Sequence, residues 1–164
     1  MGMASHLGPW LLGTVKNTTG TTAGYIRNMG ATHSYQNKAI TATDTTAQTT
    51  LAVLPAGALI QQIQILVTTA YTVSTPTFSF FVNGTAINTA ATAAGITFGN
   101  TGRASFTLGA NNAAGAALLA NVGTSDAIVS FTQATGSSTG NAILEISYIV
   151  RNSDGTYAPT SSQA

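Results

Sequence analysis

The longest alternation of apolar and polar positions in the chain runs from Leu59 to Thr68, directly after a turn-forming sequence. Pro55 and Gly57 mark that turn, because proline fixes φ and glycine permits a positive φ. From Leu59 onward the odd positions are mostly apolar, whereas the even positions carry polar residues in the middle of the run. A period of two predicts a β-strand with one face on a hydrophobic core.

Three glutamines and no charged residue lie on this predicted strand: Gln61, Gln62 and Gln64. An uncharged, amide-rich face suits contact with another protein more than contact with open water, so these residues are candidate interface residues. The alternative is an ordinary sandwich strand whose glutamines are solvated. Both interpretations fit the pattern.

Shorter alternating segments predict further strands at 40–43, 49–53, 103–108, 126–133 and 141–151. Residues 78–87 predict a hairpin, because Asn83-Gly84 between β-formers is typical of a type I′ turn. Residues 88–102 read as a long loop with a possible short strand at 96–98. Residues 111–120 fit either one short helical turn or an apolar strand. The inward-facing positions predict a core that includes Ile63, Ile65, Phe106, Phe131 and Tyr148.

About eight short strands separated by turns predict an all-β protein. The expected architecture is an antiparallel β-sandwich, and both a jelly roll and an immunoglobulin-like Greek key fit the strand pattern. The sandwich domain is expected to span residues 39–152, followed by a polar C-terminal tail at 153–164.

Residues 1–38 are predicted to form an extended N-terminal arm, because they contain too few apolar residues for a core of their own. The anchors expected to attach this arm to a neighbouring subunit are Trp10, Leu11, Leu12 and Tyr25. The alternative is that the segment wraps around its own domain.

Composition narrows the possible functions. Charged residues make up 5% of the chain, against about 25% in a typical domain, and such a surface makes most sense when copies of the chain or a partner cover it. The net charge is +1 and the five Lys and Arg residues are spread along the chain, so a nucleic-acid site is not expected. No apolar run approaches the ~20 residues of a membrane span.

Candidate chemistry is sparse, and neither a cofactor nor a metal is expected. The two histidines, His6 and His33, lie in the predicted arm, and the four acidic residues show no metal-ligand spacing. The chain has no cysteine, and no nucleophile elbow, P-loop or zinc pattern occurs. We therefore expect a protein that is not an enzyme. A carbohydrate- or receptor-binding module is a less favoured possibility, for which the candidate stacking groups are Tyr71, Phe98 and Tyr157.

Two segments resemble small structural proteins of tailed bacteriophages, namely capsid decoration (cement) proteins and related minor head proteins. The first is Leu54-Pro55-Ala56-Gly57-Ala58-Leu59-Ile60 with the strand after it and Val67-Thr68-Thr69-Ala70-Tyr71. The second is Ser5-His6-Leu7-Gly8-Pro9-Trp10-Leu11-Leu12-Gly13-Thr14-Val15. The likeness covers residues 5–30 and 50–72.

This resemblance implies a virion structural protein that binds the major capsid protein on the outer capsid surface. It further implies a homo-oligomer, often a trimer. Because the N-terminus lacks a basic region followed by an apolar stretch, we expect assembly in the host cytoplasm, without export. The family has no catalytic motif, so no individual site residue follows from it. The alternative within the same virion is a tail or head–tail component such as a tube or fibre subunit.

Overall fold

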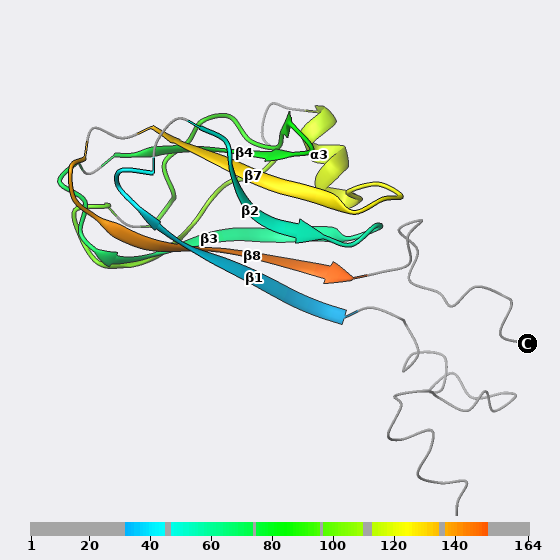
Figure 1. The fold of residues 1–164 in the computed structure, drawn as a ribbon, viewed down its shortest axis with the longest axis horizontal. Coiled ribbons are helices and arrows are strands. Elements are labelled where there is room, and N and C mark those ends of the chain that lie inside the picture. The colour runs from blue at the N-terminus through cyan, green and yellow to red at the C-terminus, as the bar shows by residue number, and fades with distance from the viewer. Residues whose placement is uncertain are drawn as a thin grey trace, which may run out of the picture.

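The computed structural model describes residues 32–44, 47–73, 75–95, 97–109, 113–134 and 137–150. These residues form two packed antiparallel sheets and one short helix (Figure 1). Sheet A contains β1 (Thr32–Thr41), β8 (Asn141–Val150), β3 (Leu59–Thr69) and β6 (Gly102–Ser105), in that order. Sheet B contains β2 (Thr49–Leu54), β7 (Ala127–Ala134), β4 (Thr77–Val82) and β5 (Thr85–Ala86). The predicted all-β sandwich is confirmed.

The strand pairing is nested. The first strand pairs with the eighth, the second with the seventh, the third with the sixth and the fourth with the fifth. Two further pairs, β3 with β8 and β4 with β7, complete the sheets. This order fits the jelly-roll alternative. It does not fit the immunoglobulin-like one, in which the first two strands are neighbours in one sheet, whereas β1 and β2 lie in different sheets here.

The core lies between the sheets, where the inward-facing side chains of both meet. Five of the described phenylalanines are buried in the core, and the rings of Phe80 and Phe106 pack edge to face at 4.8 Å. The five predicted core residues are all buried: Ile63, Ile65, Phe106, Phe131 and Tyr148.

The start of β3 departs from the expected uninterrupted alternation. A β-bulge shifts the pairing register between Ile60 and Gln62. As a result Ile60 is buried, both Gln61 and Gln62 are exposed, and Ile63 is buried again. The alternation read from the sequence placed Ile60 on the glutamine face, and this placement is wrong because a bulge adds one residue to one strand and changes the facing of those before it.

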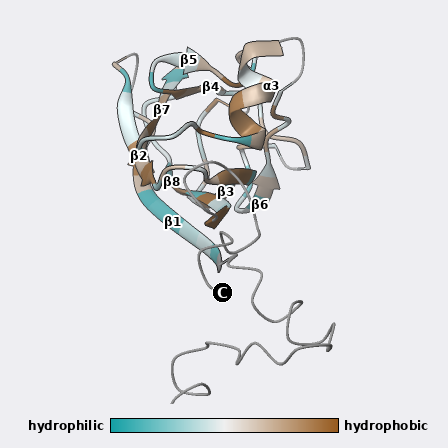
Figure 2. Ribbon diagram, turned by 90° about the vertical axis from the view of Figure 1, so that its right-hand side faces the viewer, coloured by the Kyte–Doolittle hydropathy of each residue, from teal (hydrophilic) through white to brown (hydrophobic). Residues whose placement is uncertain are grey.

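Local sequence signals account for the hairpin and the helix. Asn83 and Gly84 have φ angles of 48° and 82°, which fits the predicted type I′ turn between β4 and β5. The ambiguous segment forms α3 (Ala113–Ala120), which Figure 2 shows in hydrophobic colours at one end of the sandwich. Phe98 is buried within the long loop, and Thr97 and Phe98 do not belong to a strand.

Sheet A begins earlier than the expected arm boundary. Strand β1 starts at Thr32 and pairs with β8 along its whole length. Thr32 to Lys38 therefore belong to the sheet and not to an extended arm. The expected anchors and the expected tail lie outside the described residues: Trp10, Leu11, Leu12, Tyr25 and 153–164.

Replacing Ile65 by alanine should lower the free energy of unfolding by about 2–5 kcal/mol, because the change removes buried methyl groups and leaves a cavity. Ile65 is fully buried between the sheets. Reversible urea denaturation measures the change, with Leu66→Ala on the opposite, half-buried face of β3 as the matched control. A loss for Ile65→Ala below about 0.5 kcal/mol, the size typical of surface substitutions, would contradict the register.

Candidate interaction surface

The predicted glutamine face lies on the outer side of sheet A. Gln62 is paired in register with Ser147, and Gln64 is paired with Glu145, both on β8. Gln61 and Gln62 are exposed at the bulge, while Gln64 is half-buried. The bulge therefore presents two neighbouring glutamines to one side, which a regular strand would not do.

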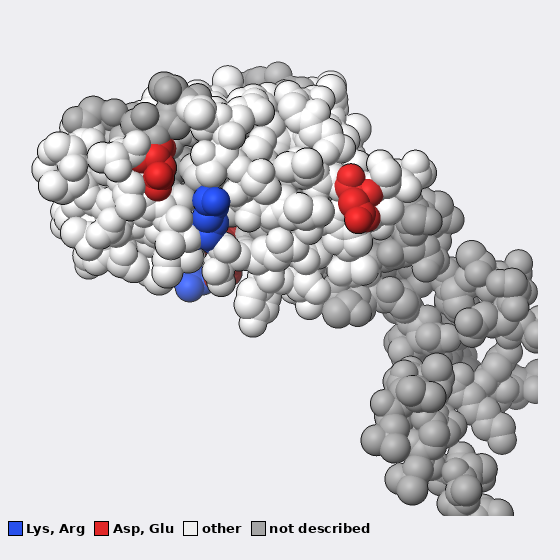
Figure 3. Space-filling view, viewed as in Figure 1, with Lys and Arg blue, Asp and Glu red and all other residues white. Residues whose placement is uncertain are grey.

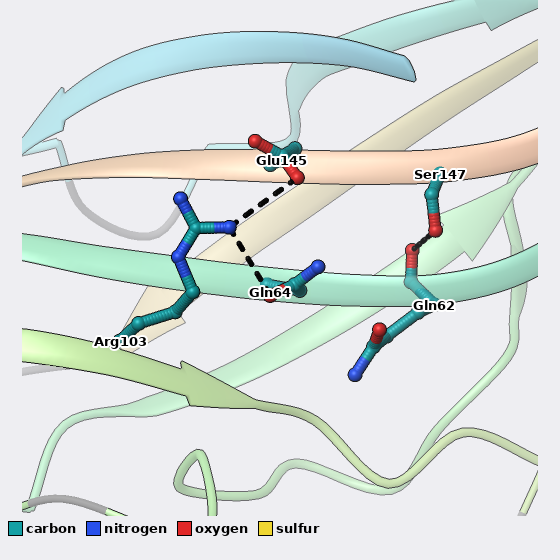
Figure 4. Close-up of polar contacts among 5 residues, drawn as sticks. All are labelled: Gln62, Gln64, Arg103, Glu145 and Ser147. Carbon is teal, nitrogen blue, oxygen red and sulfur yellow. Dashed lines mark hydrogen bonds and ion pairs between the residues drawn. The ribbon is translucent and has the colours of Figure 1, made fainter. Parts of the chain in front are cut away.

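Polar contacts hold one half of this face in place (Figure 4). Arg103 Nη1 donates to Gln64 Oε1 at 3.4 Å and lies 3.7 Å from Glu145 Oε1. The Arg103 and Glu145 side chains are 54% and 27% exposed, and a surface ion pair of this kind contributes at most about 1 kcal/mol. Gln64 is therefore positioned by β6 and β8 and is not a free amide.

The other half of the face presents amides that have no partner among the described residues. Ser147 Oγ donates to the main-chain oxygen of Gln62 at 3.5 Å, and Figure 4 shows the Gln62 side chain directed away from this contact. Within the described part of the chain, the side-chain amides of Gln61 and Gln62 make no hydrogen bond. Each amide can both donate and accept, so the pair can recognise the polar groups of a protein surface.

The few charged side chains mostly serve local structure. Asp44 accepts hydrogen bonds from the Thr41 main-chain nitrogen at 2.6 Å and from its hydroxyl at 3.1 Å. Asp126 Oδ1 accepts from the Ala56 main-chain nitrogen at 3.2 Å and so fixes the turn before β3. The carboxylates that are far apart in the sequence also make separate contacts in the fold.

The described ranges contain no cluster of three His, Cys, Asp or Glu side chains that could hold a metal ion. They also contain no helix long and apolar enough to cross a membrane. The candidate site is a surface of hydrogen-bonding amides on sheet A.

Comparison with solved structures finds a likeness to a chain of a phage capsid. A chain of the structure titled "Cyanophage Pam1 capsid asymmetric unit" is 25% identical to this chain. The alignment covers 74% of this chain and 85% of that chain, with a TM-score of 0.48. No family model matches the sequence, and no curated protein matches it. A TM-score below 0.5 does not establish a common fold.

Two of the three aromatic residues considered for carbohydrate stacking are not available to a ligand. Tyr71 and Phe98 are 3% and 0% exposed and pack edge to face against each other at 5.4 Å. The prediction that they could stack on a sugar is wrong, because both belong to the core under the loops. Tyr157 lies outside the described residues.

The core contains a buried polar pair that the sequence reasoning did not single out. Within the described part of the chain, neither the Tyr71 hydroxyl nor either polar atom of the Gln133 amide has a hydrogen-bond partner of good geometry. Burial raises the pKa of the Tyr71 phenol, the adjacent Gln133 amide opposes this shift, and the Asp44 carboxylate adds to it. The burial of Gln133 could have been predicted from the sequence. In the alternation of β7 it falls on the same face as the buried residues Val129 and Phe131.

This raised pKa predicts a loss of stability in alkali. The folded protein keeps the Tyr71 proton at a pH where the unfolded chain, with a pKa near the ordinary value of 10.0, has lost it. The free energy of unfolding should therefore fall as pH rises above that value. In denaturation experiments at pH 9 and above, the free energy of unfolding should fall less with rising pH for Tyr71→Phe than for the wild type. An equal fall in both proteins would contradict the assignment to Tyr71.

Proposed function

We propose that this chain is a non-enzymatic structural protein of a phage virion, specifically a decoration (cement) protein. It binds the major capsid protein on the outer capsid surface and does so as a homo-oligomer, with the trimer implied by the sequence resemblance as the expected form. The observation that carries the proposal is the near absence of charge on the surface of the sandwich (Figure 3).

A surface with so few charges is more typical of a protein that is covered by binding partners than of an isolated soluble domain. An isolated soluble domain usually has about 25–35% charged residues on its surface. In the described residues the acidic groups are Asp44, Asp126 and Glu145 and the basic groups are Lys38 and Arg103. Four of these five take part in turn contacts or in the Arg103–Glu145 pair. Much of the remaining exposed surface in the described residues is Thr, Ser, Asn, Gln, Ala and Gly, which suits polar packing against a shell.

The fold is compatible with this role but does not distinguish it from other functions. Jelly rolls occur in viral capsid proteins and also in lectins, and one fold supports many functions. The burial of Tyr71 and Phe98 weakens the carbohydrate-binding alternative.

The decisive experiment is to locate the protein on intact particles by cryo-electron microscopy and to measure its copy number. Density distributed over the outer shell, in hundreds of copies, is expected for a decoration protein. A ring at one vertex or a stack in the tail would contradict it and would assign the chain to the tail or the head–tail connection. Capsids lacking the protein should also rupture at lower temperature or lower osmotic stress than decorated capsids.

Attachment should not depend on pH between 8 and 6. His33 is exposed on β1 and is the histidine that the described residues contain, and His6 belongs to the N-terminal segment. Sedimentation of decorated particles at pH 8 and at pH 6 should therefore recover the same amount of bound subunit, for the wild type and for His33→Gln alike. Release of subunits at pH 6 that His33→Gln prevents would overturn this expectation.

A further inference from the structure

Four strands stand at the ends of the two sheets: β1 and β6 in sheet A, and β2 and β5 in sheet B. The open side of such a strand carries main-chain donors and acceptors that can pair with a strand of another copy of the chain. Many proteins protect these edges with charged side chains, but charged residues make up only 5% of this chain. Other features of the edge strands are therefore needed to prevent pairing between copies.

Three of the four edge strands offer little to an added strand. Strands β5 and β6 have two and four residues, and the main-chain groups of Ser105 on β6 are already bonded to those of Ala94 at 2.8 and 3.3 Å. Strand β2 has six residues, and its pairing with β7 shifts register between Thr50 and Ala52, which makes an edge less regular. Strand β1 has ten residues and no proline, so it is the long edge of the sandwich.

The side chain of Gln36 on β1 occupies main-chain pairing groups of the neighbouring edge strand β2. Gln36 Nε2 donates to the Val53 main-chain oxygen at 2.8 Å, and the Val53 main-chain nitrogen donates to Gln36 Oε1 at 3.3 Å. These are the two bonds that a residue of an added antiparallel strand would exchange with Val53. Gln36 Nε2 also donates to the hydroxyl of the buried Tyr148 at 2.9 Å. One side-chain amide, held from the core, therefore takes the place of a strand at Val53.

Lys38 is a charged residue on the inner face of β1. It lies on the same face as the buried Ile40, and its register partner on β8 is Leu144, which is fully buried. The Lys38 side chain is half-buried, and no acidic side chain of the described residues pairs with it. Its apolar stem packs on the core while its ammonium group stays in water, which it reaches past the open side of β1. A strand added there would bury this charge without a partner, at a large cost in free energy.

We propose that Gln36 and Lys38 together prevent this edge of the sandwich from pairing with a strand of a second copy. Gln36 occupies the pairing groups of Val53 on β2, and Lys38 makes a strand added beside β1 unfavourable. The net charge of +1 causes little repulsion between copies, so the protection has to be local to the edge. Any oligomer of the folded chain then forms through side-chain surfaces, without extending a sheet from one copy into the next.

The test uses Lys38→Met, Gln36→Met and the double variant, each in the full chain. Methionine keeps an unbranched side chain at each position and removes the polar end group. In sedimentation velocity, Lys38→Met and the double variant should form species larger than the wild type does, with association strengthened roughly tenfold or more. Lys38→Arg keeps the charge and should match the wild type. Lys16→Met removes the same charge outside the described residues and should also match it.

Amide hydrogen exchange gives a second readout that is specific for the edge. In Gln36→Met, measured at a concentration at which it does not associate, the Val53 amide should exchange faster than in the wild type, because its N–H has lost Gln36 Oε1 as an acceptor. In the associated form of Lys38→Met, the amides on the open side of β1 should exchange more slowly than in the wild type, because an added strand covers them.

A size distribution of Lys38→Met equal to that of the wild type would overturn the proposal. Association that leaves the β1 amides exchanging as fast as in the wild type would overturn it as well, because the copies would then meet elsewhere. If Gln36→Met fails to fold, the comparison of Lys38→Met with Lys38→Arg decides alone. All of these measurements use the isolated protein, so their outcome is independent of whether the chain decorates a capsid.

Discussion

Deletion of residues 1–24 should leave a folded sandwich that attaches poorly to capsids or to its own copies. Strand β1 starts only at Thr32 and the described core lies wholly within the sandwich, so the far-UV spectrum should be unchanged. Burial of Trp10, Leu11 and Leu12 on a neighbour would supply about 1.5–3 kcal/mol per side chain. This gain exceeds the cost of ordering a few residues, at about 1–2 kcal/mol each for the backbone.

A matched pair of variants separates anchoring from simple loss of length. Replacing Trp10, Leu11 and Leu12 by alanine should weaken binding nearly as much as the deletion, measured as the fraction of subunit that co-sediments with capsids. Replacing Thr18 and Thr19 by alanine in the same segment should leave binding unchanged. If the truncated chain unfolds, the segment belongs to its own domain's core. If the truncated chain binds with unchanged affinity, the glutamine face is the better candidate interface.

Replacement of Gly140 by alanine should destabilise the sandwich by roughly 4 kcal/mol or more, at the upper end of the range for single substitutions. A Cβ atom at this position would lie 2.6 Å from Cγ and Cδ2 of the Tyr71 ring, and Gly140 has a φ of 137°. Neither side can move away easily, because Tyr71 is buried and the Gly140 oxygen accepts a hydrogen bond from the Ala42 nitrogen at 2.9 Å.

Gly123→Ala is the control for this prediction. Gly123 has a similar φ of 115°, but a Cβ added there would have no atom within 4 Å. Its substitution should therefore cost only the backbone strain, about 1–3 kcal/mol. Urea denaturation measures both losses, and equal losses would show that the contact with Tyr71 is not rigid. Combining Gly140→Ala with Tyr71→Ala should recover part of the difference, because the ring that causes the clash is then absent.

Local features of the fold could be predicted from the sequence because they depend on neighbouring residues. The alternation on β7 and β8 predicted the correct inward faces, since the pairing of β7 with β4 and of β8 with β1 contains no register shift. Asn83-Gly84 predicted the hairpin because few other dipeptides adopt two successive positive φ angles. The start of β3 could not be predicted in the same way, because a bulge is a difference in residue count between two paired strands, and the alternation within one strand does not show it.

Long-range features could not be predicted. Alternation shows that a strand has two different faces, but it does not show which strand lies beside it. Both the nested order and the Gln36–Val53 bridge depend on residues far apart in sequence. Of the candidate site, the outward position of Gln62 and Gln64 could be predicted from alternation. The exposure of Gln61, which the bulge causes, and the contact of Gln64 with Arg103 could not. The anchors of the N-terminal segment remain a prediction.

The nested pairing also has a consequence for the route by which the chain folds. Strand β1 has β8 as its partner, about a hundred residues later, so sheet A cannot close before β8 has been synthesised. Pairings this distant in sequence make folding slow. During that delay β1 is open on both sides, and the β8 of a neighbouring nascent copy can pair with it as well as its own. In a host cell that produces many copies at once, exchange of strands between subunits competes with correct folding, and its extent should increase with expression level.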